Sequence, residues 1–327
     1  MAVMTYIEAV TKALQEEMKR DNRVFVLGED VGKRGGVFRA TMGLIEEFGE
    51  DRVVDTPLTE SAIAGVAIGA AGYGMRPIAE MQFADFIMPA FNQIVSEASK
   101  IRYRSNGTFQ CPMVIRAPYG GGIHGALYHS QSIEKLFAGV PGLKIVAPST
   151  PYDVKGLLKA SIRDEDPVLF LEHKRCYRLI KGEVPSEDYT IPLGKAEVKR
   201  DGSDVTVISY GLMVHYALEA AEKLAEEGIS VHVLDLRSLI PLDKEAILEA
   251  TAKTGKVLVL HEDNKTGGFG GEIASLIAEE AFFELDAPVR RLCGPDVPAM
   301  PYNKTLEKEF MLNPEKIANA LRDLAEF

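Results

Sequence analysis

Glu60 is the first residue whose place in the chain suggests chemistry. It stands where a short apolar segment, RVVD, passes through Thr56, Pro57 and Leu58 into a helix of very small residues. Such a junction lies at the carboxyl end of a parallel strand, where α/β folds bind their ligands. The helix dipole alone also favours an acidic residue in the first turn. The pattern therefore indicates either a ligand-binding carboxylate or a simple helix-start residue.

A second candidate is the segment GGGIHGALYHSQS. Its glycines at 120, 121, 122 and 125 predict a flexible loop, which is costly unless the backbone must approach something closely. The loop carries His124, Tyr128 and His129, and histidine is the side chain that exchanges protons near neutral pH. We interpret it as a site of proton transfer, with a surface loop of incidental histidines as the alternative.

Several common cofactor and metal motifs do not fit. There is no GxxxxGK[ST] run, which excludes a phosphate-binding P-loop. GGFGG at 267–271 lies between an apolar strand and a helix, but Ile273 stands where a dinucleotide fingerprint needs glycine, so a tight turn is the better interpretation. His124 and His129 do not share a helix, and no third residue has the spacing of a zinc ligand.

The elements that must position these residues alternate regularly. Continuously apolar strands such as VFVLG, RPIAE and VLFLEH alternate with helices, which predicts α/β domains whose mostly parallel sheets are covered on both faces. The helix beginning near Glu60 carries Ser61, Gly65 and Gly69 every four residues, a face that suits close packing against another subunit or within the chain. Residues 89–105 are predicted to form one helix with Pro89 near its start.

The chain length predicts two domains, since 327 residues exceed what one hydrophobic core usually supports. Between about Tyr177 and Lys199 the alternation gives way to a stretch of prolines, glycines and mixed charges. We predict two doubly wound domains, residues 1–180 and 201–327, joined by a linker at 181–200.

Composition and charge narrow the class of protein further. The net charge of -11 argues against a nucleic-acid or anionic-membrane partner and suits a basic protein partner. Cys111, Cys176 and Cys293 are too few and too scattered for a disulfide framework. The first residues lack the apolar run of a signal peptide. We expect a cytoplasmic protein with reduced thiols.

These segments together resemble one family. DTPLTESAIAGVAIGAAGYGMRPIAEMQFADF, KIRYRSNG and GGGIHGALYHSQS closely resemble the β subunit of thiamine-diphosphate-dependent 2-oxo acid dehydrogenases. GSDVTVISYGLMVHYALEAAEKL and VLDLRSLIPLD are similar to the C-terminal domain that this subunit shares with transketolase. The resemblance covers nearly the whole chain. It implies a transketolase-like pyrimidine-binding domain followed by a transketolase C-terminal-like domain.

The resemblance implies a role for each marked residue. Glu60 would bond the pyrimidine ring nitrogen of thiamine diphosphate and favour the tautomer that deprotonates the thiazolium. Leu58, Gln82 and Phe86 would surround the same ring, and many relatives have tyrosine where Phe86 stands, so a hydroxyl contact is missing here. His129 matches the family's active-site histidine, which stabilises the adduct or passes a proton during acyl transfer to lipoamide.

The resemblance also implies partners. The family's β subunit joins an α subunit in an α2β2 heterotetramer, the decarboxylating component of a multienzyme complex. This chain has no GDG motif of the kind that holds the cofactor's diphosphate and magnesium, so we expect the α subunit to supply both and the chain alone to be inactive. The C-terminal domain is expected to bind the lipoyl acyltransferase core through a small basic domain.

Substrate and potassium are finer expectations. GALYHSQS and QFADF look most like the branched-chain subfamily, which implies 2-oxo acids derived from valine, leucine and isoleucine; pyruvate or acetoin is the alternative. Some relatives bind a structural potassium ion through backbone oxygens beside the strand MVIRAP and the turn SIRDEDP, and the matching positions here would include Val114, Ser161, Asp164 and Asp166. A solvated acidic turn explains Asp164 to Asp166 nearly as well.

A competing class is a non-catalytic α/β regulatory or electron-transfer subunit. The missing diphosphate motif favours it. The combination of Glu60, Gln82, Phe86 and His129 at family spacing argues against it, because a pure binding module would not need these residues.

Overall fold

A computed structural model describes residues 1–327, which divide into two units. The first comprises residues 1–119 and 136–193, and the second comprises residues 120–135 and 194–327. Helix α5, Glu134–Ala138, crosses from one unit to the other. The glycine- and histidine-rich segment therefore belongs to the second unit, although the sequence predicts it within the first domain.

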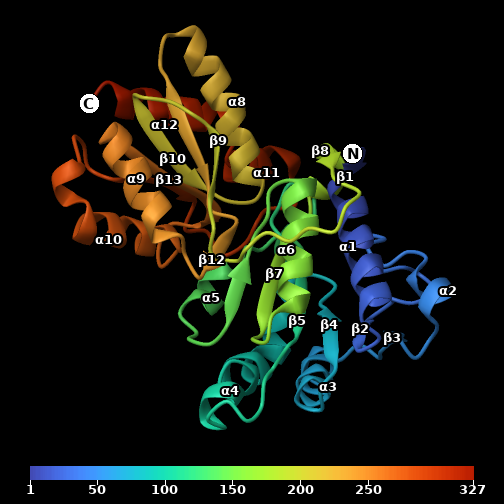
Figure 1. Cartoon of the computed structure of the whole chain (residues 1–327). Coiled ribbons are helices and arrows are strands. Elements are labelled where there is room, and N and C mark those ends of the chain that lie inside the picture. Colours follow the sequence, from blue (N-terminus) through green and yellow to red (C-terminus); the bar gives the residue numbers. More distant parts are fainter. The chain divides into compact units, whose positions relative to one another are not determined.

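The first unit is built on a parallel sheet in the order β6-β7-β5-β4-β2-β3 (Figure 1). Strands β2, β4, β5 and β7 are almost wholly buried and mostly apolar, as expected for a sheet covered on both faces. Because neighbouring strands are parallel, their carboxyl ends meet at one edge, which we call the carboxyl edge. The strands are β2 Val24–Gly28, β3 Val53–Asp55, β4 Arg76–Glu80, β5 Val114–Tyr119, β6 Lys144–Val146 and β7 Val168–His173.

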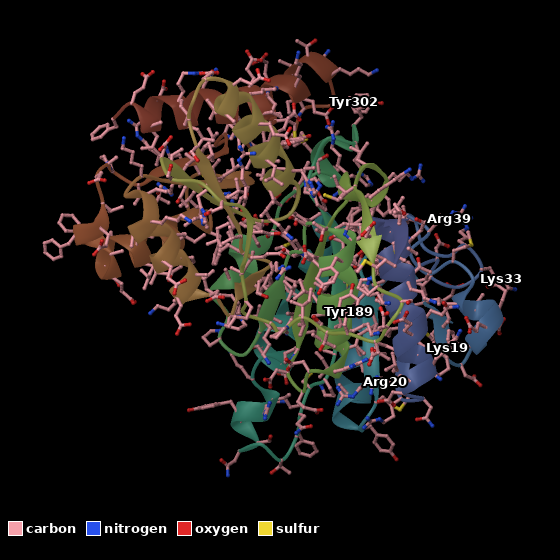
Figure 2. All side chains as sticks on the ribbon, turned by 45° about the horizontal axis from the view of Figure 1, so that its top comes forward. Lys19, Arg20, Lys33, Arg39, Tyr189 and Tyr302 are labelled. Atoms are coloured by element: carbon pink, nitrogen blue, oxygen red, sulfur yellow. The ribbon has the colours of Figure 1, made fainter.

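Helix α1, Tyr6–Arg20, has stabilising residues at both of its ends. Thr5 and Glu8 form a capping box at its start, in which the Glu8 N–H donates to Thr5 Oγ1 over 3.3 Å. Lys19 and Arg20 lie in its last turn, where cations complement the helix dipole (Figure 2). The other helices are α2 Leu44–Phe48, α3 Glu60–Gly72, α4 Ile101–Arg104, α6 Pro151–Arg163 and α7 Cys176–Leu179.

The single helix predicted over residues 89–105 is wrong. The structure has a 3-10 helix η1, Ala84–Ala90, a π-helical turn η2, Gln93–Ala98, and the short helix α4. Pro89 lies inside η1 and has no N–H to donate, and Ser99 N–H donates to the carbonyl of Ile94, five residues back. These two features divide the segment.

The second unit has its own sheet in the order β14-β13-β10-β11-β9, in which β9 is antiparallel to β11 and the remaining pairs are parallel. Helices α8, Leu212–Glu226, and α12, Pro314–Ala325, pack together on one side of this sheet (Figure 1). Helices α9, Lys244–Thr254, and α10, Gly270–Glu280, cover the other side. The mostly parallel α/β class predicted from the sequence is thus confirmed in both units. The strands are β9 Glu197–Arg200, β10 Val205–Ser209, β11 Val231–Asp235, β12 Ser238–Ile240, β13 Val257–Asn264 and β14 Arg290–Gly294.

The helices of the second unit include two at the end of the chain. Asn303 and Asn313 cap α11 and α12, and their side chains accept from backbone N–H groups of the first turn. The helices are α8 Leu212–Glu226, α9 Lys244–Thr254, α10 Gly270–Glu280, α11 Lys304–Phe310 and α12 Pro314–Ala325, with the short 3-10 helices η3 Ala126–Tyr128 and η4 Phe282–Glu284.

The stretch predicted as a linker contains regular structure. Strand β8, Lys181–Val184, pairs antiparallel with β1, Ala2–Thr5, and β9 begins at Glu197. The stretch between them is irregular. No helix in the chain is long and apolar enough to cross a membrane.

Candidate functional site

Glu60 begins α3 at the carboxyl edge of the first unit and is only 8% exposed. Glu29, which follows β2, is its acidic neighbour and is equally buried. Burial raises the pKa of the Glu29 carboxyl, and the charge of Glu60 raises it further. Glu29 Oε1 is buried without a hydrogen-bond partner. The two acids therefore leave a spare buried acceptor, which suits a ligand that donates hydrogen bonds.

Leu58, Gln82 and Phe86 lie at the same edge. Leu58 precedes α3, and Gln82 and Phe86 follow β4, whose neighbour β2 also pairs with β3. Gln82 and Phe86 are half-buried, whereas Leu58 is 80% exposed. The structure thus brings all four predicted cofactor-binding residues, Glu60 included, to one edge.

A buried ion-pair network joins three strands of the sheet near this edge. Arg116 of β5 is fully buried and donates to both Glu172 oxygens, over 2.7 and 2.8 Å, and also to Glu80 of β4. Burial lowers the pKa of Arg116, but the two carboxylates outweigh it and hold the pKa above its usual value. Tyr177 O–H donates to Glu172 over 2.6 Å. Since Glu80 stands two residues before Gln82, the network fixes the start of the Gln82–Phe86 segment.

His129 lies elsewhere, in a loop of the second unit that we call the histidine loop, residues 120–131. The Gly120 N–H closes the loop by donating to the carbonyl of Gln131 over 3.0 Å. His129 is half-buried and lies against Gly125, where an added Cβ would come within 2.6 Å of the His129 carbonyl oxygen. No larger residue fits at position 125 without displacing His129. The structure therefore assigns His129 and Glu60 to different units.

Known proteins place this chain in a family. "Transketolase, pyrimidine binding domain" matches residues 2–180, and "Transketolase, C-terminal domain" matches residues 194–317. The 2-oxoisovalerate dehydrogenase subunit beta of Bacillus subtilis (strain 168) is 70% identical over 327 residues, all of both chains. The chain belongs to the β subunits of the 2-oxo acid dehydrogenases. The resemblance stated from the sequence is thereby confirmed.

Two further relatives of this β subunit are less similar in sequence. Pyruvate dehydrogenase E1 component subunit beta of the same organism is 47% identical, again over 100% of both chains. A solved structure described as a split-gene transketolase, an inactive β4 tetramer, has a TM-score of 0.80 and 27% identity, covering 99% of this chain and 98% of that one. The family uses thiamine diphosphate, and a subunit named beta implies an alpha partner.

The predicted potassium-binding residues lie around the turn after α6. Lys144 Nζ donates to both oxygens of Asp164 over 2.7 Å and is 3.2 Å from Asp166 Oδ2. Arg102 pairs with Asp166 over 2.7 Å. Burial raises the pKa of Asp166, but these cations outweigh it and lower the pKa.

Backbone oxygens of the same turn are also engaged. Arg76 donates to the carbonyls of Ile162 and Asp164, each over 3.0 Å. Val114 begins β5, and the Ser161 hydroxyl donates to the carbonyl of Leu157 over 2.7 Å. Protein cations thus already neutralise the Asp164 and Asp166 carboxylates, which leaves neither side chain free as a potassium ligand, while binding through backbone oxygens stays a prediction. No group of three or more His, Cys, Asp or Glu side chains in the chain is arranged to hold a metal.

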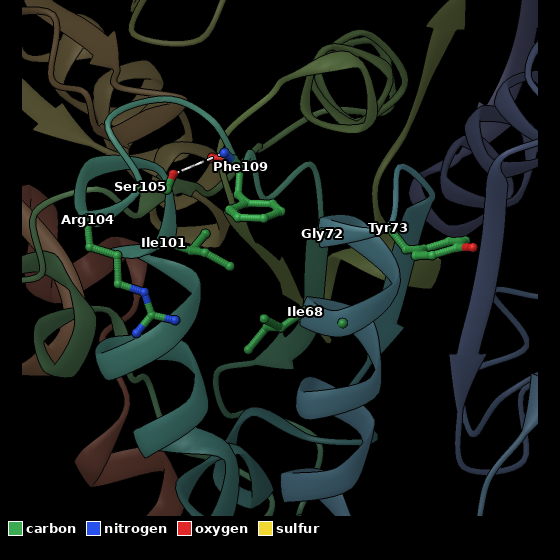
Figure 3. Close-up of a pocket in the computed structure, with 8 residues that line it drawn as sticks. Ile68, Gly72, Tyr73, Ile101, Arg104, Ser105 and Phe109 are labelled. Carbon is green, nitrogen blue, oxygen red and sulfur yellow. Dashed lines mark hydrogen bonds between the residues drawn. The ribbon is translucent and has the colours of Figure 1, made fainter.

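The small-residue face of α3 is uncovered in this chain. Ser61 donates to the carbonyl of Pro89 over 2.5 Å, but an added Cβ at Gly65 or Gly69 would meet nothing within 4 Å. A hollow of about 580 Å³ lies beside this face, between α3 and α4, with Phe109 above it and Tyr73 pointing away (Figure 3). Its lining comprises Ile68, Gly69, Gly72, Tyr73, Ile101, Arg104, Ser105 and Phe109. Intrachain packing therefore does not explain the glycines.

Sequence reasoning missed Glu29. It follows β2 as Glu60 follows β3, so the rule that selected Glu60 also selects Glu29. The signal was present in LGED, directly after an apolar strand.

Proposed function

We propose that this chain is the β subunit of the decarboxylating component of a branched-chain 2-oxo acid dehydrogenase complex. The observation that carries the proposal is its 70% identity, over the full length, with a 2-oxoisovalerate dehydrogenase subunit beta, against 47% with a pyruvate dehydrogenase β subunit of the same organism. The reaction is oxidative decarboxylation of a branched 2-oxo acid, with transfer of the acyl group to a lipoyl group. The chain acts only with its α subunit.

Glu60, Leu58, Gln82 and Phe86 are the residues that would hold the pyrimidine half of thiamine diphosphate. When bound, this cofactor supplies a carbon nucleophile that attacks the 2-oxo group. The Glu60 carboxyl group would share its proton with the pyrimidine ring nitrogen, Leu58 and Phe86 would exclude water, and Gln82 would offer a polar contact. The unpartnered buried oxygen of Glu29 supports this fit, because an aminopyrimidine brings N–H donors.

His129 would hold or pass a proton near the reacting carbon. Its side chain is half-buried in a loop that only glycine at 125 permits, a restricted setting of the kind that catalytic groups need.

The α subunit would complete the enzyme by holding the cofactor's diphosphate and magnesium. We propose the uncovered glycine face of α3 as a place where a partner subunit packs, because closely approaching backbones need small residues. The acyltransferase core would bind the second unit through a basic docking domain, for which the net charge of -11 is suitable.

Reconstitution tests the proposal. The chain alone should show no turnover, and mixing it with its cognate α subunit should create activity. We expect kcat/KM for 3-methyl-2-oxobutanoate to exceed that for pyruvate at least about tenfold, since one or two methyl groups in an apolar pocket are worth roughly 10–200-fold.

Three other results would revise it. A preference for pyruvate would assign the chain to a pyruvate dehydrogenase. Activity with neither acid, in a correctly assembled tetramer, would favour the non-catalytic class. Robust decarboxylation by the isolated chain would overturn the need for an α subunit.

A further inference from the structure

The histidine loop has a backbone that its own sequence does not favour. Gly120 and Gly122 have positive φ, and so do His124 and Ala126, at +57° and +53°. Residues other than glycine rarely adopt this conformation, and it persists only where the surroundings hold it. Something outside the loop must therefore fix His124.

Two buried carboxylates of the second unit hold the loop. Glu262 of β13, 7% exposed, accepts from the Gly121 N–H over 2.6 Å. Glu307 of α11, 4% exposed, accepts from the His124 N–H over 3.2 Å, and its other oxygen pairs with His124 Nδ1. A hydrogen bond from the backbone N–H and a contact of the ring nitrogen thus join His124 to the same carboxyl group, which restrains both the φ of His124 and its side chain.

The restraint passes directly to His129. Gly125 follows His124, and an added Cβ there would lie 2.6 Å from the His129 carbonyl oxygen and 2.7 Å from its Cβ. Any shift of the backbone at His124 moves Gly125 and hence the main chain that carries the His129 ring. Misplacing a reacting group by about 1 Å can cost roughly 100-fold in rate.

We propose that Glu307 is a positioning residue, which holds His124 and thereby sets the place of His129. The inference rests on the proposed function, because the role of His129 belongs to it. Glu307 touches no substrate in this scheme; it acts through the loop alone.

The test uses the assembled α2β2 enzyme. Glu307→Ala should lower kcat by about 10–100-fold, while KM for the 2-oxo acid stays within about twofold. Glu307→Gln should retain intermediate activity, because its amide oxygen still accepts from the His124 N–H but carries no charge. Glu309→Ala is the matched control, an exposed acid two residues along the same helix, and should leave kcat unchanged.

A double variant separates positioning from general damage. If Glu307 acts through His129, then His129→Ala with Glu307→Ala should be no slower than His129→Ala alone. Hydrogen exchange of the peptide over residues 120–131 should speed up in Glu307→Ala and not in Glu309→Ala. If Glu307→Ala does not fold, Glu307→Gln and His124→Ala, which removes the half-exposed partner, replace it in both measurements.

Failure of the proposed role of His129 and failure of the positioning role of Glu307 give different results. Full activity in His129→Ala would refute the role of His129 under the proposed function, and hydrogen exchange would still decide whether Glu307 holds the loop. An impaired His129→Ala combined with a fully additive effect of Glu307→Ala would refute the positioning role alone. Unchanged exchange of residues 120–131 would overturn it as well.

Discussion

Arg116→Met should lower the free energy of unfolding of the isolated chain by about 3–5 kcal/mol, the usual cost of removing one partner of a buried ion pair. The substitution keeps much of the side-chain volume but removes three donated hydrogen bonds, two to Glu172 and one to Glu80. Both carboxylates would be left buried without their cation. Tyr177 still donates to Glu172 over 2.6 Å, so Glu80 carries most of the loss.

Urea unfolding followed by far-ultraviolet circular dichroism measures this loss as a shift in midpoint at constant slope. Arg104→Met is the matched control, because Arg104 pairs with Glu97 over 2.6 Å at the surface, with 54% of its side chain exposed. The control should change the free energy by no more than about 1 kcal/mol. A triple variant that also converts Glu80 and Glu172 to glutamine should recover most of the stability.

The loss should also depend on pH. Burial already raises the pKa of Glu80, against the lowering effect of Arg116, and removing Arg116 raises it further. A carboxyl group whose folded pKa lies above its unfolded value contributes stability at low pH, and this stability is lost as pH rises through the folded pKa. Arg116→Met should therefore be less damaging at pH 5 than at pH 8. A loss below about 1 kcal/mol at pH 8, or a larger loss at pH 5, would refute the reasoning.

Three further outcomes follow from the same contacts. Gly125→Ala should reduce kcat at least about tenfold without lowering the melting temperature appreciably, because the new Cβ displaces His129; normal turnover would show that the loop adjusts. Glu60→Gln should reduce turnover and thiazolium proton exchange by orders of magnitude, while sedimentation shows that the tetramer still assembles. Proton exchange at the wild-type rate would show that Glu60 only begins the helix. Replacing potassium with sodium should not change the melting temperature, because Lys144 pairs with the Asp164 carboxylate and Arg76 donates to the Asp164 carbonyl; a clearly higher melting temperature in potassium would support a metal site there.

Local patterns were enough to predict much of the first unit. The apolar run before Gly28 and the small residues after Glu60 specify β2 and α3 by composition and length. Helix α6 went unpredicted although Thr150 caps it and Pro151 occupies its first turn, a signature visible in the sequence. The π-helical turn at 93–98 is different, because hydrophobic periodicity does not distinguish its hydrogen bonds from those of an α-helix.

The site divides in the same way. The position of Glu60 was predicted because it depends on a strand and a helix that are adjacent in sequence. The unit to which His129 belongs was not predicted correctly, because distant residues hold its loop. Glu262 lies 141 positions beyond Gly121, and Glu307 lies 183 positions beyond His124. No local pattern reports a contact at such a separation.

That separation has a consequence for synthesis. The ribosome releases the first unit's six parallel strands before Glu262 or Glu307 has been made, so the sheet can form while the histidine loop between β5 and α5 still lacks both carboxylates. A nascent chain that ends before α11 would have a folded first unit and a histidine loop without its contact to Glu307. The histidine loop therefore acquires both of its carboxylate partners only after β13 and α11 have been made.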